Sequence, residues 1–278
     1  MSGSLKNIQG TIVLAGAGKM GGAMLSGWLA QGLDARRVAV IEPHPSKEIQ
    51  AYLSGGVRLN PSAKEAGNLA AFVVALKPQA FREAGPALKP YVDATTLVVS
   101  IMAGMTIGAI AEVLTGKDLG GHVVRAMPNT PAAIGRGITV AVAAKNVSHA
   151  QRETADGLLR ATGSVEWVTD EGLMDAVTAV SGSGPAYIFL LAEELARAGI
   201  AAGLPEALAT KLARETVAGS GELLHRSELS AEVLRQNVTS PGGTTAAALE
   251  VLMGQDGLQS LLTRAVAAAT KRSKELAK

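Results

Sequence analysis

The sequence predicts an α/β fold in which a doubly wound parallel sheet over residues 1–168 precedes an all-helical domain over residues 169–278. Two observations predict this arrangement. Up to Val168, short and almost continuously apolar runs alternate with helical segments, which is typical of parallel strands covered on both faces. From Asp170 onward, the only periodicity is helical, so the sheet is expected to end at about Val168.

Eight apolar runs are expected to form the strands, and several helices are expected between them. The helices follow Gly21, follow Pro45-Ser46, cover 106–114 and begin after Ser148, where Gln151 three residues later completes a capping-box signature. The expected strands are 12–15, 38–41, 57–59, 71–76, 96–101, 123–127, 138–143 and 165–168.

A glycine-rich turn joins the first strand to the first helix. Gly16 allows a tight turn, Gly18 lets the backbone approach a diphosphate, and Gly21 lets the helix pack closely on the strand. The free N–H groups of the helix N-terminus then favour an anion. This context predicts a Rossmann-type dinucleotide-binding domain over residues 1–168, rather than a glycine turn that binds nothing. The cofactor-binding residues expected here are Gly16, Ala17, Gly18, Lys19, Met20 and Gly21.

The composition argues against several other classes of protein. The chain has no cysteine and four widely separated histidines, so we expect neither a disulfide nor a metal site. A formal net charge of +2 and only 3% aromatic residues argue against nucleic-acid binding. No apolar run is long enough to span a bilayer, and the N-terminus has no apolar signal region. We therefore expect a cytoplasmic protein without a membrane partner.

Glu42 ends the second strand, 21 residues beyond Gly21. An acid at this position can accept hydrogen bonds from the adenosine ribose, which favours NADH over NADPH. His44 and Lys47 follow closely, and either could meet a 2′-phosphate, so the sequence leaves the choice between NADH and NADPH open.

Three further loops follow strands at their carboxyl ends, the edge of an open sheet where ligands bind. The candidate residues of these loops are Leu76, Lys77 and Pro78 after the fourth strand, Ala103 and Gly104 after the fifth, and Met127, Pro128 and Asn129 after the sixth. Each loop taken alone could be a simple turn, but three on one edge indicate a ligand cleft.

The helical domain is expected to pair with a second subunit. The segment 185–202 is apolar nearly all round, which requires burial on most sides. About 110 residues of small-residue helices can hardly bury such a surface alone. The sequence therefore predicts a homodimer.

Asn237-Val-Thr-Ser240-Pro-Gly-Gly-Thr-Thr245 precedes another expected helix. We expect Ser240 to cap this helix, Pro241 to occupy its first turn, and the two glycines to leave backbone amides open. Such a nest can bind a carboxylate without an arginine. Ser181-Gly-Ser-Gly-Pro185 lacks the spacing of a nucleophile elbow, so we interpret it as a helix N-terminus facing an anion or the cofactor.

In these motifs the chain resembles the pyrroline-5-carboxylate reductases, the last enzymes of proline biosynthesis. The resemblance runs from the glycine turn to the C-terminal helix. It rests on five motifs in order: Gly16-Ala-Gly-Lys-Met-Gly21, Lys77-Pro-Gln79, Arg125-Ala-Met-Pro-Asn-Thr-Pro131, Ser181-Gly-Ser-Gly-Pro-Ala-Tyr187 and Val238-Thr-Ser-Pro-Gly-Gly-Thr-Thr245.

The resemblance implies hydride transfer from NADPH or NADH to the C=N bond of 1-pyrroline-5-carboxylate, giving proline. It implies that the glycine loop and the turn after Glu42 hold the adenosine and diphosphate, and that the three later loops line the nicotinamide end. Thr245 would hydrogen-bond the ring nitrogen. The substrate carboxylate would lie among Asn237, Ser240, Gly242, Gly243 and Thr244. Interlocked helical domains would bring cofactor and substrate loops together at a dimer interface, and dimers can assemble into rings.

Two other functions are compatible with parts of the pattern. A β-hydroxyacid dehydrogenase would combine a similar glycine turn with a helical domain, but such enzymes rely on a catalytic lysine there. Lys211 is the only lysine between Glu171 and Arg264, and it lies in no recognisable motif. A non-catalytic dinucleotide sensor would keep the glycine turn without needing the nest at Gly242-Gly243 or the hydroxyl of Thr245.

Overall fold

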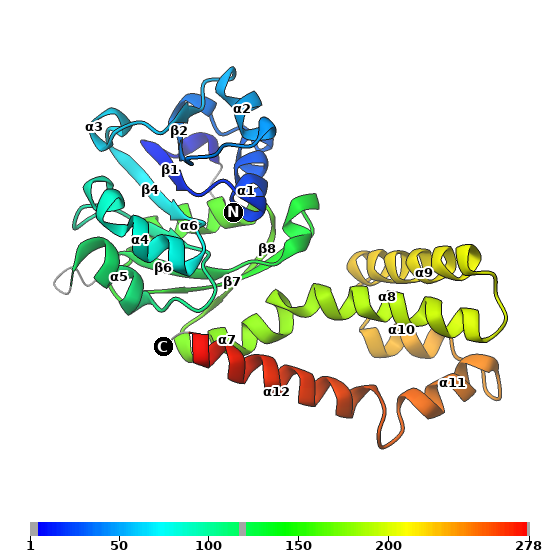
Figure 1. Cartoon of the computed structure of the whole chain (residues 1–278). Helices are drawn as coiled ribbons and strands as arrows, with labels where there is room; N and C mark the ends of the chain where they lie inside the picture. Colours follow the sequence, from blue (N-terminus) through cyan, green and yellow to red (C-terminus); the bar gives the residue numbers. More distant parts are fainter. Residues whose placement is uncertain (1–4, 117–120, 277–278) are drawn as a thin grey trace. The chain divides into compact units, whose positions relative to one another are not determined.

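The computed structural model describes residues 5–116 and 121–276 of the chain (Figure 1). Its packing divides these residues into two compact units. The first contains the sheet, runs to Gly182 and includes the chain again from Thr270; the second runs from Ser183 to Ala269. The expected boundary at residue 168 coincides with the end of the last strand, and as a boundary between domains it stays a prediction.

The described part of the first unit contains an eight-stranded sheet with the order β3-β2-β1-β4-β5-β6-β7-β8. Only β6 and β7 pair in antiparallel fashion among these strands; the other pairs are parallel. All eight predicted strands are present, with shifted ends such as 69–74 instead of 71–76. The strands are β1 (Thr11–Ala15), β2 (Val38–Ile41), β3 (Arg58–Leu59), β4 (Leu69–Val74), β5 (Val98–Ser100), β6 (Val123–Met127), β7 (Gly137–Ala143) and β8 (Gly163–Val168).

The strand order reverses between β1 and β4, because β2 and β3 lie on one side of β1 and β4 to β6 continue on the other. In doubly wound sheets, a ligand binds at the carboxyl edge beside such a switch point. The turn after β1 and the loop after β4 flank this point, so the predicted cofactor loops are placed where the topology favours a ligand.

Helices cover both faces of the sheet. One apolar core includes Trp28, whose Nε1 donates to the carbonyl of Leu158 over 2.8 Å, and the other includes Phe72, Phe81 and Ile110. The helices of this unit are α1 (Lys19–Ala30), α2 (Lys47–Leu53), α3 (Ala63–Ala66), α4 (Pro78–Leu88), α5 (Ile107–Thr115), α6 (His149–Arg160) and α7 (Met174–Val177). Shorter segments are the 3₁₀ helices η1 (Leu5–Asn7), η2 (Ala35–Arg37), η3 (Lys89–Tyr91), η4 (Thr130–Ile134) and η5 (Glu171–Leu173), and the π-helical turn η6 (Thr178–Gly182).

Polar side chains cap several of these helices, and one of the caps was predicted from the sequence. Ser46 caps α2, and Ser148 and Gln151 form the predicted capping box of α6. Thr106 caps α5 by accepting from the Ala109 amide. These caps satisfy backbone N–H groups that have no partner inside the helix and fix where each helix starts.

The second unit is all-helical, as predicted. Small residues let α8 and α9 pack closely: an added Cβ on Gly199 would lie only 3.2 Å from the Cβ of Ala209. In the single chain no residue of α8 is buried, and Phe189 is 68% exposed. This large apolar surface needs a cover. The helices are α8 (Gly184–Ala201), α9 (Glu206–Arg226), α10 (Ala231–Asn237), α11 (Thr244–Leu252) and α12 (Leu258–Leu276), the last of which ends among residues of the first unit.

Candidate functional site

The glycine turn after β1 has the geometry of a diphosphate cradle. Gly16 has a φ of 91°, and a Cβ there would lie 2.8 Å from the carbonyl oxygen of Ala75. A Cβ on Gly21 would collide with the carbonyl oxygen of Gly16. Around Gly18, by contrast, an added Cβ would meet nothing within 4 Å. Backbone contacts thus exclude side chains at two glycines, whereas the third leaves open space.

The first turn of α1 faces this open space with its own N–H groups. Gly18 is the N-cap residue and provides no side-chain hydrogen bond. Lys19 is exposed, Met20 is half-buried and Ala17 is buried. An uncapped helix N-terminus beside open space suits a dinucleotide diphosphate, so these residues fit the cofactor that the sequence predicts.

Glu42 reaches from the end of β2 into the glycine turn. Its Oε2 accepts from the Ala17 amide over 3.0 Å, and its Oε1 accepts from the His44 amide over 3.1 Å. A carboxylate offers about four acceptor positions, so two remain for other donors. The His44 side chain is exposed, as is Lys47. The acid is therefore fixed beside the turn, whereas the His44 and Lys47 side chains extend into solvent.

β4 pairs with β1, β5 pairs with β4 and β6 pairs with β5, all in parallel. The three later loops therefore lie on the same edge of the sheet as the glycine turn. The structure brings together the ends of these strands, as predicted. Lys77 is the exposed N-cap residue of α4, and Pro78 is its first residue. Leu76 is half-buried, with Cδ2 2.9 Å from where a Cβ of Gly16 would be.

Gly104 and Met127 make close contacts within the first unit. Gly104 has a φ of 71°, and its Cβ position lies 3.5 Å from Leu276 at the end of α12, while Ala103 is exposed. The Sδ-methyl of Met127 lies against Gly182, where an added Cβ would be 2.5 Å away. The end of α12 and the π-helical turn therefore support these two loops.

Asn129 has a structural contact that its sequence pattern did not reveal. Its Oδ1 accepts from the Ile138 amide over 3.0 Å, which ties the loop after β6 to β7. Pro128 lies between Met127 and Asn129 and is buried. The loop is held on both sides of this proline.

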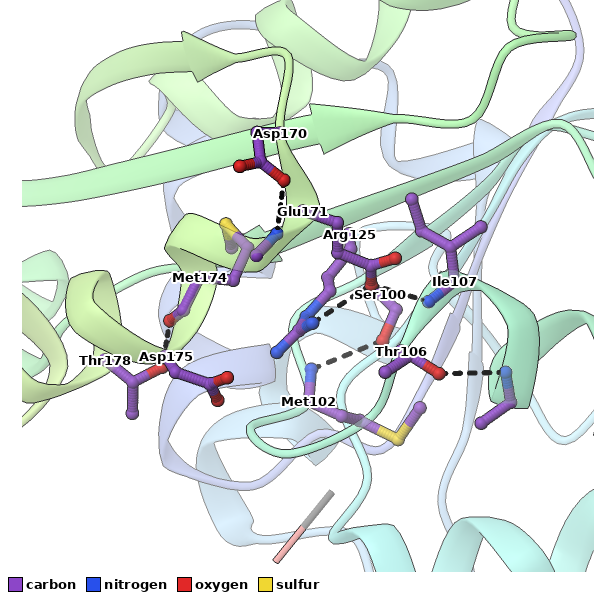
Figure 2. A network of polar contacts seen from close by, with 12 residues as sticks. Ser100, Met102, Thr106, Ile107, Arg125, Asp170, Glu171, Met174, Asp175 and Thr178 are labelled. Atoms are coloured by element: carbon purple, nitrogen blue, oxygen red, sulfur yellow. Dashed lines mark hydrogen bonds and ion pairs between the residues drawn. The ribbon is translucent and has the colours of Figure 1, made fainter. Parts of the chain in front are cut away.

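A buried ion pair fastens two of these loops, and sequence reasoning missed it. Arg125 on β6 is 4% exposed, and its Nη1 lies 3.0 Å from Oε1 of Glu171. The same oxygen accepts from the Ile107 amide over 2.8 Å, at the start of α5 (Figure 2). A carboxylate at a helix N-terminus is also favoured by the helix dipole. The available signal was an arginine inside the apolar strand Val123–Met127, since a buried charge needs a partner.

Figure 2 also shows how the neighbouring turns are closed. The Ser100 hydroxyl accepts from the Met102 amide over 3.3 Å, which shapes the loop after β5. Asp170 accepts from the Gly172 amide, and Thr178 donates to the carbonyl of Met174. These bonds order the segment that carries Glu171, so the ion pair stands on a defined backbone.

The predicted substrate residues lie in the second unit, around the start of α11. The helix begins at Thr244 with Gly243 as its N-cap and without a side-chain cap. The expectation that Ser240 caps this helix and that Pro241 lies in its first turn is therefore wrong. The carbonyl of Ser240 accepts from the Gly243 amide over 3.0 Å.

The reason is a tight turn before the helix. Pro241 occupies its second position and Gly242, with a φ of 68°, its third, the pattern of a type II turn. This turn separates Ser240 from the helix. Ser240 and Asn237 are exposed, and Thr245 is half-buried.

The predicted helix N-terminus does lie within Ser181-Gly-Ser-Gly-Pro185: α8 begins at Gly184 with Ser183 as its N-cap residue, and no side chain caps it. Ser181 and Gly182 belong to the π-helical turn η6, and the Ser181 hydroxyl donates to the carbonyl of Val177 over 3.0 Å. Ser183 already has helical angles. Gly182 of this motif leaves room for the methyl group of Met127, as described above.

Across 5–116 and 121–276, no group of three or more His, Asp or Glu side chains is placed to hold a metal ion. None of the helices described is long and apolar enough to cross a membrane.

The fold and the cradle define a dinucleotide-binding protein that carries a second, helical unit. Comparisons with known proteins give the family. Residues 171–276 match the family "Pyrroline-5-carboxylate reductase dimerisation", and residues 11–104 match "NADP oxidoreductase coenzyme F420-dependent". The chain belongs to the pyrroline-5-carboxylate reductase family.

Relatives of that name align over nearly the whole chain. The pyrroline-5-carboxylate reductase of Synechocystis is 41% identical over 95% of this chain and 97% of its own length. The enzyme of Pseudomonas aeruginosa is 38% identical over 96% of each. The solved structure from Coxiella burnetii has a TM-score of 0.87 at 35% identity and covers 97% of this chain and 99% of its own. The structure from Plasmodium falciparum, which has NADP bound, has a TM-score of 0.79 at 28% identity and covers 98% and 99%. The resemblance drawn from the five motifs is confirmed, and a β-hydroxyacid dehydrogenase is not favoured.

Proposed function

We propose that this chain reduces the C=N bond of 1-pyrroline-5-carboxylate with NADH or NADPH and so forms L-proline. The observation that carries the proposal is the match to reductases of this name over nearly the full length of both chains. The nicotinamide supplies the hydride when the cofactor is bound. The protein's own residues then have to bind, orient and hold the two reactants.

For the cofactor, we propose that the cradle of Gly16 to Gly21 holds the diphosphate and that Glu42 receives the adenosine ribose. The open space at Gly18 and the uncapped start of α1 support the first assignment. The anchored carboxylate supports the second, because its two free acceptor positions suit ribose hydroxyls and its charge opposes a 2′-phosphate. On this basis we propose a preference for NADH.

For the nicotinamide end, we propose the loops after β4, β5 and β6. Their place at one sheet edge beside the switch point supports this assignment. The residues proposed are Leu76, Lys77, Pro78, Ala103, Gly104, Met127, Pro128 and Asn129.

For the substrate, we propose that its carboxylate binds at the start of α11. The amides of the first turn have no side-chain cap, and Gly243 adds no side chain in front of them. The helix dipole favours an anion at this point. Gly242 and Thr244 border the same turn, with Ser240 and Asn237 nearby. Thr245 offers a hydroxyl for the ring nitrogen, which solvent protonates readily in a small cyclic imine.

We further propose a homodimer as the minimal assembly, with rings of dimers as a larger one. The exposed apolar side chains of α8 support a partner surface of the same kind. We place the enzyme in the cytoplasm, where a soluble imine and a soluble cofactor are supplied.

The test is steady-state oxidation of NADH and NADPH, in parallel, with 1-pyrroline-5-carboxylate as acceptor. Turnover is expected with both cofactors, with the higher kcat/KM for NADH. Folded protein that binds the cofactor yet turns over neither would contradict the proposed reaction. Activity restricted to a larger cyclic imine would correct the substrate but keep the reaction class.

A further inference from the structure

Asn60 is the only non-glycine residue with a positive φ, 47°, among residues 5–116 and 121–276. It directly follows β3, and its amide donates to the carbonyl of Val40 on β2 over 2.7 Å. Asparagine tolerates this left-handed conformation better than most residues. The backbone angle alone therefore indicates no function for Asn60. Its side-chain contacts are more informative.

Both ends of the Asn60 side chain bind the backbone of one residue, Glu42. Its Oδ1 accepts from the Glu42 amide over 2.8 Å, and its Nδ2 donates to the Glu42 carbonyl over 3.0 Å. Strands β2 and β3 pair only through Ala39 with Arg58 and Val40 with Leu59. The Asn60 carboxamide thus continues this pairing by hydrogen bonds after the β3 backbone has turned away.

These two hydrogen bonds, which we call the Asn60 clamp, hold the backbone of Glu42, the acid proposed to bind the cofactor ribose. Glu42 leaves β2 with both its N–H and its C=O held by Asn60, and its carboxylate spans the gap to the Ala17 amide in the glycine turn. Glycine, the usual residue for a left-handed angle, would allow the same turn but could not make either bond. The Asn60 side chain therefore has a role beyond the backbone angle, and both of its hydrogen bonds go to Glu42.

We propose that Asn60 is a positioning residue for cofactor selection: it fixes Glu42 so that the carboxylate faces a ribose 2′-hydroxyl and rejects a 2′-phosphate. The inference rests on the proposed role of Glu42 in the cofactor site. The contacts that carry this role are the two hydrogen bonds from the Asn60 carboxamide to the backbone of Glu42. Without the clamp, the end of β2 can move and the carboxylate loses its fixed place.

The test measures equilibrium binding of NADH and NADPH by nicotinamide fluorescence, on Asn60→Gly, on Glu42→Gln and on the double variant. Asn60→Gly keeps the backbone angle and removes both bonds. We expect it to lower the preference for NADH, expressed as the ratio of the two Kd values, by about 3- to 10-fold, the range of one to two lost hydrogen bonds. In the Glu42→Gln background, Asn60→Gly should leave the ratio unchanged, since there is no charge left to position.

Two results would contradict the proposed role of Asn60. Equal weakening of both cofactors by Asn60→Gly, or the same change of ratio with and without the Glu42 charge, would show that Asn60 only closes the turn. If Asn60→Gly does not fold, Asn60→Ser removes the carboxamide that binds both backbone groups of Glu42 and adds no charge. It should change the ratio in the same direction, and no change would overturn the inference.

Failure of the proposed function would look different. An unchanged ratio in Glu42→Gln would remove Glu42 from the cofactor site and the inference with it. Absence of turnover with 1-pyrroline-5-carboxylate, while the Kd ratios respond as expected, would contradict the reaction and leave the role of Asn60 intact.

Discussion

Replacing Glu171 by alanine should destabilise the sheet unit. The substitution removes the one oxygen that binds both the Arg125 guanidinium, over 3.0 Å, and the Ile107 amide, over 2.8 Å. The Arg125 side chain is only 5% exposed, so it would be left as a buried charge without this partner, while the start of α5 would lose a hydrogen bond.

The magnitude follows from burial. Removing one partner of a buried ion pair costs about 3–5 kcal/mol. Since 32% of the Glu171 side chain is exposed, water can partly replace it, and we expect the lower end, about 3 kcal/mol. For a unit of this size the melting temperature should then fall by about 6–12 °C.

The assay is urea and thermal unfolding at one fixed protein concentration, with Glu153→Ala as the matched control. Glu153 loses the same atoms, but its side chain is 61% exposed in a surface pair with His149 on α6, so its free energy of unfolding should change by less than about 0.5 kcal/mol. Glu171→Gln keeps an acceptor for the Ile107 amide and should fall between the two. Equal stability of Glu171→Ala and Glu153→Ala would refute the reasoning.

Three further substitutions test the site. Thr245→Ala should fold normally and lower kcat/KM by about 10- to 100-fold, the loss of about 1.5–3 kcal/mol of hydrogen bonding; unchanged kinetics would remove Thr245 from the mechanism. Gly18→Ala meets no protein atom, so its melting temperature should match wild type while the Kd of the cofactor rises at least about tenfold. Gly21→Ala collides with the Gly16 carbonyl and should lower the melting temperature as well; identical melting of the two glycine variants would contradict the assigned roles.

The sheet could be predicted because its strands are short apolar runs with clear ends. Val38–Ile41 and Val123–Met127 were predicted with the bounds that the structure has. Local signals suffice where a run is bounded by turn residues and alternates with helices. The start of α11 was misplaced because Ser240 and Gly243 are both good N-cap residues, and only the turn at Pro241 decides between them.

The Arg125–Glu171 ion pair and the Asn60–Glu42 hydrogen bonds could not be predicted, since each joins residues distant in sequence. Glu171 is 46 residues from Arg125, and Asn60 is 18 from Glu42. The position of Arg125 in an apolar strand at least indicates that it needs a buried partner. Asn60 gives no such signal in the sequence, because an asparagine before a proline is typical of an ordinary turn.

The most direct test of the account is the stoichiometry of the reaction. Purified protein is supplied with 1-pyrroline-5-carboxylate and limiting NADH, and proline formed is measured against NADH oxidised. The account predicts one molecule of L-proline for each NADH, because a single hydride reduces a single C=N bond. Oxidation of NADH without proline, or cofactor binding without any oxidation, would contradict it.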